Sequence, residues 1–292
     1  MRQPKLFTTI RDYSWSLFRQ DALAGLTVAL VALPLSIAIA IASGATPAQG
    51  LVTAIIGGFV ISLTSGSRVQ IGGPTGAFIV VVYSVIADHG YDGLVLATMM
   101  AGAILLVAGF FRAGRLIALV PEPVINGFTV GIAIIIAASQ LKDFLGLDIA
   151  NLPAEFIPKI MVLAKALPAS NPFAVGVAML ALVLMVTLRK LAPRSPSLVI
   201  GVAAGSILAV AASLPVDTIA SRFGELPAAL PMPSMPEFSI AKAIELLPSA
   251  LIIAFLAGVE SLLSAIVADR MIAGHHRPNA EIMAQGYGNI AS

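Results

Sequence analysis

Long apolar runs follow one another along nearly the whole chain, separated by short polar stretches. A helix needs about 20 predominantly apolar residues to cross the hydrocarbon core of a bilayer. By this criterion, the candidate spans lie at residues 21–42, 50–65, 74–87, 93–111, 123–141, 172–191, 197–214 and 248–272. The first run is too long for the apolar core of a cleavable signal peptide, so we expect it to be retained. The pattern predicts an all-α integral membrane protein, a multi-span helical bundle.

The third span, 74–87, is short, and a glycine-rich segment precedes it. Residues 69–71 favour extended backbone, and the glycines around Pro74 make a regular helix costly. Proline suits the first position of a helix, so we expect a broken helix that restarts at about Pro74, at membrane depth. Such a start exposes backbone N–H groups and the positive end of the helix dipole, which together form an anion site without a cationic side chain. The alternative is a glycine-rich packing kink between helices.

Composition excludes several classes of protein. Hydrophobic residues make up 58% of the chain and charged residues only 11%, whereas a soluble domain carries about 25% charged residues. The chain has no cysteine and a net charge of +2, so we expect neither a Cys-ligated metal site nor nucleic-acid binding. Zinc-protease motifs, nucleotide-binding glycine loops and a plausible Ser/His pair are also missing from the sequence. We therefore expect no enzyme, no cofactor and no metal site.

The distribution of the 17 Lys and Arg residues indicates an orientation. Cytoplasmic loops collect basic residues. When the N-terminus is placed inside and the spans alternate, most basic residues fall on the inner side, while most acids fall outside. Segments 151–169 and 215–247 then become outer loops with short amphipathic helices, and 282–292 follows a polar stretch as the start of a further helix. We expect a multi-pass protein of the cell (inner) membrane with a cytoplasmic N-terminus.

Glu260 is the only ionisable residue well inside a predicted span. A carboxylate at the bilayer centre costs about 3 kcal/mol, so we expect it to face the protein interior. Removal from water favours the protonated form of a carboxyl group, which would let Glu260 exchange a proton. Ser264 follows four residues later on the same helix face. The alternative is that Glu260 only anchors helices through hydrogen bonds.

Pro34 interrupts the first span at its middle, and proline inside a helix predicts a kink. The kink could form part of a cavity wall, or it could be an ordinary helix kink without a functional role.

Four blocks of sequence resemble the SulP anion permease family, and the resemblance covers nearly the whole chain. The blocks are 21–28 with its continuation to 51, 72–77, 121–131, and 260–264 with 268–270. Four blocks in the same order are far more specific than any one of them. The resemblance implies a fourteen-helix domain of two inverted seven-helix repeats, with half-helices at positions three and ten. Residues 1–292 would then be an incomplete transmembrane transport domain that holds the first repeat and the start of the second. We expect no STAS domain in this chain.

The resemblance also implies a site. Its substrate-binding residues would be Thr75, Gly76, Ala77 and Phe78 on the third helix, with Pro34 and Ser36 opposite. Glu260 and Ser264 match eighth-helix positions at which sodium-coupled bicarbonate members carry Asp and Thr. Because Glu stands here instead of Asp, we expect proton coupling or exchange rather than coupling to Na+.

The function implied is secondary active transport of a small inorganic or carboxylate anion, such as bicarbonate, sulfate or a dicarboxylate. The mechanism would be alternating access, with symport of H+ through Glu260 across the lipid bilayer. Family analogy also implies a homodimer. The alternatives are a proton-coupled nucleobase carrier, an anion channel or motor of the same architecture, and a structural membrane fragment without activity.

Overall fold

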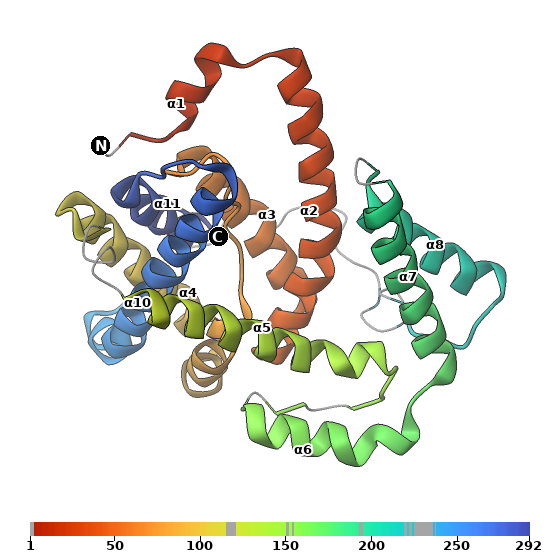
Figure 1. Cartoon of the computed structure of the whole chain (residues 1–292). Helices are drawn as coiled ribbons and strands as arrows, with labels where there is room; N and C mark the ends of the chain where they lie inside the picture. Colours follow the sequence, from red (N-terminus) through yellow and green to blue (C-terminus); the bar gives the residue numbers. More distant parts are fainter. Residues whose placement is uncertain are drawn as a thin grey trace. The chain divides into compact units, whose positions relative to one another are not determined.

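The computed structural model describes residues 3–114, 121–149, 152–153, 155–192, 195–218, 221, 224, 236 and 238–292. Every regular element within these ranges is a helix, so the predicted all-α class is confirmed (Figure 1). The elements are α1 (Leu6–Thr9), η1 (Ile10–Asp12), α2 (Trp15–Ala42), α3 (Pro47–Thr64), η2 (Gly76–Phe78), α4 (Ile79–Phe110), α5 (Glu122–Phe144), α6 (Phe156–Ala166), η4 (Leu167–Ala169), α7 (Pro172–Leu191), α8 (Ser197–Ala211), α10 (Ile240–Ile272) and α11 (Pro278–Ala291).

Several of these helices have the length and apolarity of membrane spans. Among the described residues, five segments qualify: Trp15–Ala42, Pro47–Thr64, Gly76–Phe110, Pro172–Leu191 and Ile240–Ile272. The apolar helix α8 is shorter. Large apolar side chains such as Phe59, Val210 and Phe255 are more than half exposed on these helices, which suits contact with lipid rather than with water.

The chain divides into two compact units. The first comprises Met1–Ser14, Leu35–Ile132 and Pro227–Ser292, and the second Trp15–Pro34 and Ala133–Leu226. In the first unit, α11 packs against α3 and α4, and α10 packs against α4 and α11. Its core consists of buried side chains from α4, α10 and α11, among them Leu96, Leu105, Leu246, Leu262 and Ile282. In the second unit, α7 packs against α8.

Helix α10 begins earlier than its apolar run predicted. The sequence places this span at 248–272, whereas the helix starts at Ile240. The reason is the cap: Ser239 is extended, and its side chain accepts a hydrogen bond from the amide of Lys242. Serine at such a position satisfies an otherwise orphaned amide. Pro248, which we read as the first residue of the helix, therefore lies inside it.

The predicted spans 74–87 and 93–111 are joined in a single assigned helix, α4. Gly90 is not helical within this element: it has φ 71° and ψ −179°, and the chain kinks there. A positive φ is a conformation that glycine adopts at little cost. The element therefore consists of two helical segments that meet at Gly90.

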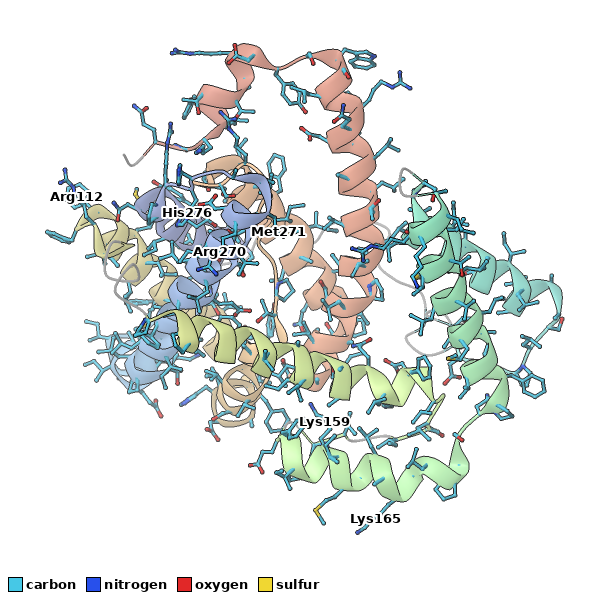
Figure 2. All side chains as sticks on the ribbon, viewed as in Figure 1. Arg112, Lys159, Lys165, Arg270, Met271 and His276 are labelled. Carbon is cyan, nitrogen blue, oxygen red and sulfur yellow. The ribbon has the colours of Figure 1, made fainter. Side chains whose placement is uncertain are left out.

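A tight turn connects α10 to α11. Ala273 ends α10 in the left-handed conformation, with φ 49° and ψ 39°. Asp269 stabilises the turn, because its Oδ2 accepts from the backbone N of His276 and pairs with Nδ1 of the same residue, both at 2.7 Å. Figure 2 shows His276 close to Arg270 and Met271 at this end of α10. The turn fixes where α11 starts.

Small residues let α4 and α11 approach closely. A Cβ atom at Gly102 would lie 2.7 Å from the carbonyl oxygen of Gly286, and one at Gly286 would lie 2.9 Å from the carbonyl oxygen of Gly102. Packing of this kind is common where helix backbones come together in membranes. Two glycines on facing helices therefore set the distance between α4 and α11.

We predict that Gly102→Ala destabilises the protein, because the added methyl group meets backbone that cannot move away. The expected loss is about 1–3 kcal/mol, in spite of the higher helix propensity of alanine. Thermal unfolding of the purified protein in detergent measures it. The control is Gly176→Ala on α7, where a Cβ would meet nothing within 4 Å. Equal unfolding midpoints for the two variants would contradict close backbone contact at Gly102.

Candidate functional site

The predicted helix break is present, and the helix restarts just after Pro74. No helix is assigned from residue 65 to residue 75, and Thr75 is extended, with φ −128° and ψ 157°. A 3₁₀ turn, η2, begins at Gly76 and leads into α4 at Ile79. The start is shifted from Pro74 because Thr75 is the cap: its Oγ1 accepts from the amide of Ala77 at 3.3 Å.

The cap also reduces the number of bare amides that we expected at the helix start. Thr75 Oγ1 occupies the amide of Ala77, and the carbonyl oxygen of Thr75 accepts from Phe78 N at 3.3 Å. Among the described residues, the amides of Thr75 and Gly76 have no acceptor. The donors left at the helix N-terminus are therefore these two groups.

The same threonine contacts the predicted coupling residue. Thr75 Oγ1 donates a hydrogen bond to Oε2 of Glu260 at 2.9 Å, although the two residues are 185 positions apart in sequence. Glu260 lies on α10 and is partly buried. One hydroxyl group thus links the start of the half-helix to the carboxyl group on α10.

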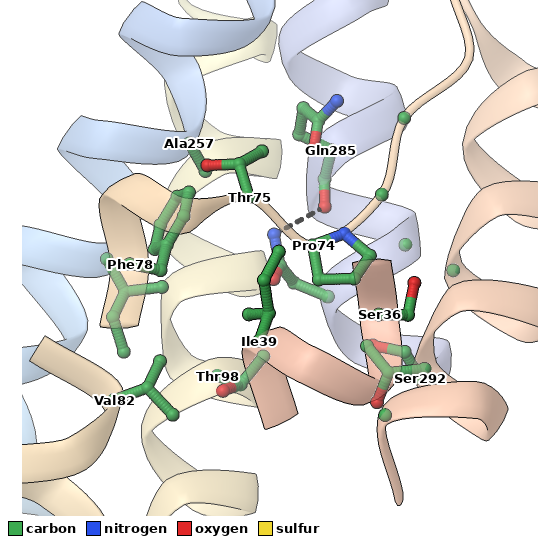
Figure 3. Close-up of a pocket in the computed structure, with 18 of the residues that line it drawn as sticks. Ser36, Ile39, Pro74, Thr75, Phe78, Val82, Thr98, Ala257, Gln285 and Ser292 are labelled. Carbon is green, nitrogen blue, oxygen red and sulfur yellow. Dashed lines mark hydrogen bonds between the residues drawn. The ribbon is translucent and has the colours of Figure 1, made fainter. Parts of the chain in front are cut away.

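Thr75 and Glu260 both line a cavity of about 260 Å³. Figure 3 shows part of this lining, including Thr75, Phe78 and Ser36. Residues from α2, α3, the broken segment, α4, α10 and α11 line the cavity. Of the residues that we predicted for the site, the lining includes Ser36, Thr75, Phe78, Glu260 and Ser264. Gly76 and Ala77 follow Thr75 in η2, and Pro34 lies inside α2, but none of these three belongs to the described lining. Their roles in substrate binding stay predictions.

The described lining holds no Lys, Arg or His, and Glu260 is its only acid. Its polar groups are mostly neutral: Ser36, Ser43, Gln49, Thr53, Gln70, Thr75, Tyr91, Thr98, Ser261, Ser264, Gln285, Asn289 and Ser292. Two of them, Ser43 Oγ and Gln70 Oε1, are buried without a hydrogen-bond partner. The wall is therefore rich in uncharged groups that can donate or accept hydrogen bonds.

The helix predicted over 282–292 is present as α11, but sequence reasoning missed that it begins at Pro278 and forms a wall of the cavity. Glu281, which we placed in the polar stretch before this helix, is completely buried. The four-residue spacing of Glu281, Gln285 and Asn289 is the signal that could have revealed it, since such residues share one helix face. Gln285 and Asn289 line the cavity, while Glu281 lies behind it.

The long apolar helices are those of a membrane protein, and the chain belongs to the sulfate permease family. The family model described as "Sulfate permease family" matches residues 18–292. The chain is 39% identical over 284 residues to the putative sulfate transporter YvdB of Bacillus subtilis, covering 97% of this chain and 53% of that protein. It is 31% identical over 292 residues to the bicarbonate transporter BicA of a Picosynechococcus species, covering 94% of this chain and 50% of that protein.

A solved structure is also similar. The transmembrane domain of a cyanobacterial bicarbonate transporter BicA has a TM-score of 0.69 and 30% sequence identity, with 95% of this chain and 72% of that chain covered. This chain is therefore part of a multi-pass membrane protein. Its relatives carry the names of transporters and not of enzymes. The chain spans about half the length of the curated relatives it matches.

We predict that Thr75→Val lowers the free energy of unfolding by about 1 kcal/mol, because Ala77 loses its cap and Glu260 its donor. Thr75→Ser keeps the hydroxyl group and should unfold close to the wild-type temperature. Thermal unfolding of both variants in detergent makes the comparison. Identical midpoints for the valine and serine variants would show that the hydroxyl makes neither bond.

Proposed function

We propose that the protein containing this chain is a secondary active transporter of small anions, such as bicarbonate, sulfate or a dicarboxylate. It works by alternating access in the inner membrane, with the N-terminus in the cytoplasm. The observation that carries this proposal is a helix that begins inside a cavity, at Thr75, opposite the carboxyl group of Glu260. The names of the relatives, which include sulfate and bicarbonate transporters, support it.

The anion binds at the start of the half-helix. Among the described residues the amides of Thr75 and Gly76 have no acceptor, and the positive end of the α4 dipole lies behind them. Ser36 and Phe78 complete the cavity around the bound anion. Non-helical backbone at membrane depth is tolerated where it lines a water-filled cavity, which fits a transport path.

Charge balance couples the anion to a proton. The described lining supplies no cationic side chain, so an anion near ionised Glu260 meets a like charge. Two unit charges about 4 Å apart repel by roughly 4 kcal/mol at an effective dielectric constant of 20. A repulsion of this size exceeds the net value of a few neutral hydrogen bonds, each about 1 kcal/mol. Protonation of Glu260 removes it, and the proton and the anion then move together.

The hydroxyl group of Thr75 carries this coupling to the anion site. A threonine hydroxyl has one hydrogen to donate and two lone pairs. While Glu260 is ionised, Thr75 donates its hydrogen to Glu260. When Glu260 is protonated, the carboxyl group donates to Thr75 Oγ1 instead, and the threonine hydrogen turns to the anion. We prefer H+ to Na+ as the coupling ion, because protonation of Glu260 reverses the direction of the hydrogen bond between Thr75 and Glu260.

We predict that Thr75→Trp abolishes saturable anion uptake into proteoliposomes, because the indole ring fills the cavity at the helix start. Labelled sulfate and bicarbonate measure uptake, and uracil is added as a competitor. Wild-type flux that persists in the tryptophan variant would refute the site. Competition by uracil would favour a nucleobase carrier, and flux that never saturates would favour a channel.

We predict that Glu260→Gln keeps anion exchange but loses its acceleration by an inward proton gradient. Glutamine resembles the protonated carboxyl group, so it still donates to Thr75 but releases no proton. Uptake with and without a pH gradient, compared with counterflow at equal pH, separates the two effects. Glu245→Gln, at an exposed position on the same helix, is the control and should retain the acceleration. Gradient-driven uptake in the Glu260 variant would contradict proton coupling through this residue.

A further inference from the structure

Glu281 is a second carboxyl group behind the cavity, and three groups donate hydrogen bonds to it. It is completely buried in α11. Its Oε2 accepts from Ser65 Oγ at 2.7 Å and from Gly66 N at 2.9 Å, while its Oε1 accepts from Ser261 Oγ at 2.9 Å. Because Glu281 does not belong to the described lining, it acts through these neighbours and not by touching a solute.

Ser261 connects Glu281 to the cavity wall. Its hydrogen is donated to Glu281, so its hydroxyl oxygen is left as an acceptor. That oxygen accepts from Gln285 Nε2 at 2.9 Å and from Gln70 Nε2 at 3.2 Å, and Gln70 Nε2 also donates to the Ser261 carbonyl oxygen at 3.0 Å. Ser261, Gln70 and Gln285 all line the cavity. The direction of each hydrogen bond along this wall therefore follows from Glu281.

We propose that Glu281 is a positioning residue that fixes the donor and acceptor arrangement of the wall formed by Gln70, Ser261 and Gln285. The inference rests on the proposed function, because it assigns this wall to the same bound anion. A primary amide carries two hydrogens on its nitrogen. Gln285 commits one of them to Ser261, and the second is a donor for an oxyanion. Gln285 becomes a specificity-determining residue whose orientation depends on Glu281.

The geometry around Gly66 explains why a carboxylate and not an amide stands at position 281. The Gly66 amide can only donate, and the bond from Arg277 N to Gly66 O, at 2.9 Å, holds this segment in place. A Cβ at Gly66 would lie 2.2 Å from the Arg277 carbonyl oxygen, so the segment admits no other residue. A glutamine at 281 must keep its oxygen toward Gly66 and turn its NH2 group to Ser261. The Ser261 oxygen, which has two lone pairs, would then accept from position 281 and from only one of its present donors, Gln70 and Gln285, so the other would lose its acceptor.

Glu281→Gln therefore tests the proposal with almost no change of size. The protein is reconstituted in liposomes, and uptake is measured with whichever of labelled sulfate, bicarbonate or succinate gives the highest saturable flux in the wild type. We expect KM to rise about tenfold with little change of Vmax, since one hydrogen bond to the anion is lost. Ser261→Ala should raise KM to a similar extent. The double variant Glu281→Gln/Ser261→Ala should have the same KM as Ser261→Ala alone, because both substitutions break the same chain of hydrogen bonds.

The matched control is Ser65→Ala, which removes a donor from the other oxygen of the same carboxylate and leaves Ser261 untouched. Its KM should stay at the wild-type value, even if its unfolding temperature falls. Equal increases of KM in Ser65→Ala and Ser261→Ala would overturn the proposal and indicate a structural role.

An unchanged KM in both Glu281→Gln and Ser261→Ala, with Thr75→Trp inactive, would overturn the role of Glu281 and leave the proposed function standing. If Glu281→Gln does not fold, the comparison of Ser261→Ala with Ser65→Ala decides. Wild-type protein without saturable flux would overturn the proposed function, and this role with it.

Discussion

The candidate site depends on one hydroxyl group, that of Thr75, which lies between a break in the helix and the carboxyl group of Glu260. A helix that starts at membrane depth leaves amides that lipid cannot satisfy. Thr75 caps one of these amides and also contacts Glu260 on α10, which packs against α4, so the break is tied to the packing of these two helices. The buried contacts of α3, α4, α10 and α11 offset the cost of placing both polar features in an apolar interior. The cavity exists because this packing leaves room around the contact.

Local features of the sequence predicted the helices and the break well. Apolar runs identify helices because lipid requires backbone groups to be satisfied within each segment. The break was placed within two residues, since glycines and Pro74 act on their immediate neighbours. The start of α10 was missed by eight residues, because charged residues between Ile240 and Pro248 resemble a loop. There the cap at Ser239 and packing against α4 outweigh composition.

The candidate site was predictable only in part. Thr75 and Glu260 each have a local signal, but their contact joins positions 185 apart, which spacing cannot reveal. Glu281 fell in the polar stretch before the predicted helix, where a charged side chain is ordinarily solvated. Its burial depends on donors from Ser65, Gly66 and Ser261, and these come together only in the folded chain. Such networks are set by tertiary structure and leave little trace in periodicity.

The close contact of Gly102 with Gly286 and the buried bonds of Glu281 have a mechanical consequence. Both contacts join helices that line the cavity, and both fix the distance between those helices. Backbone atoms set the distance at Gly102 and Gly286, and three directional hydrogen bonds set the position of Glu281. Packed interiors of this kind switch between discrete arrangements and resist gradual deformation. Any change in the shape of the cavity therefore requires these helices to move together, because none of them can bend or slide by itself without breaking these contacts.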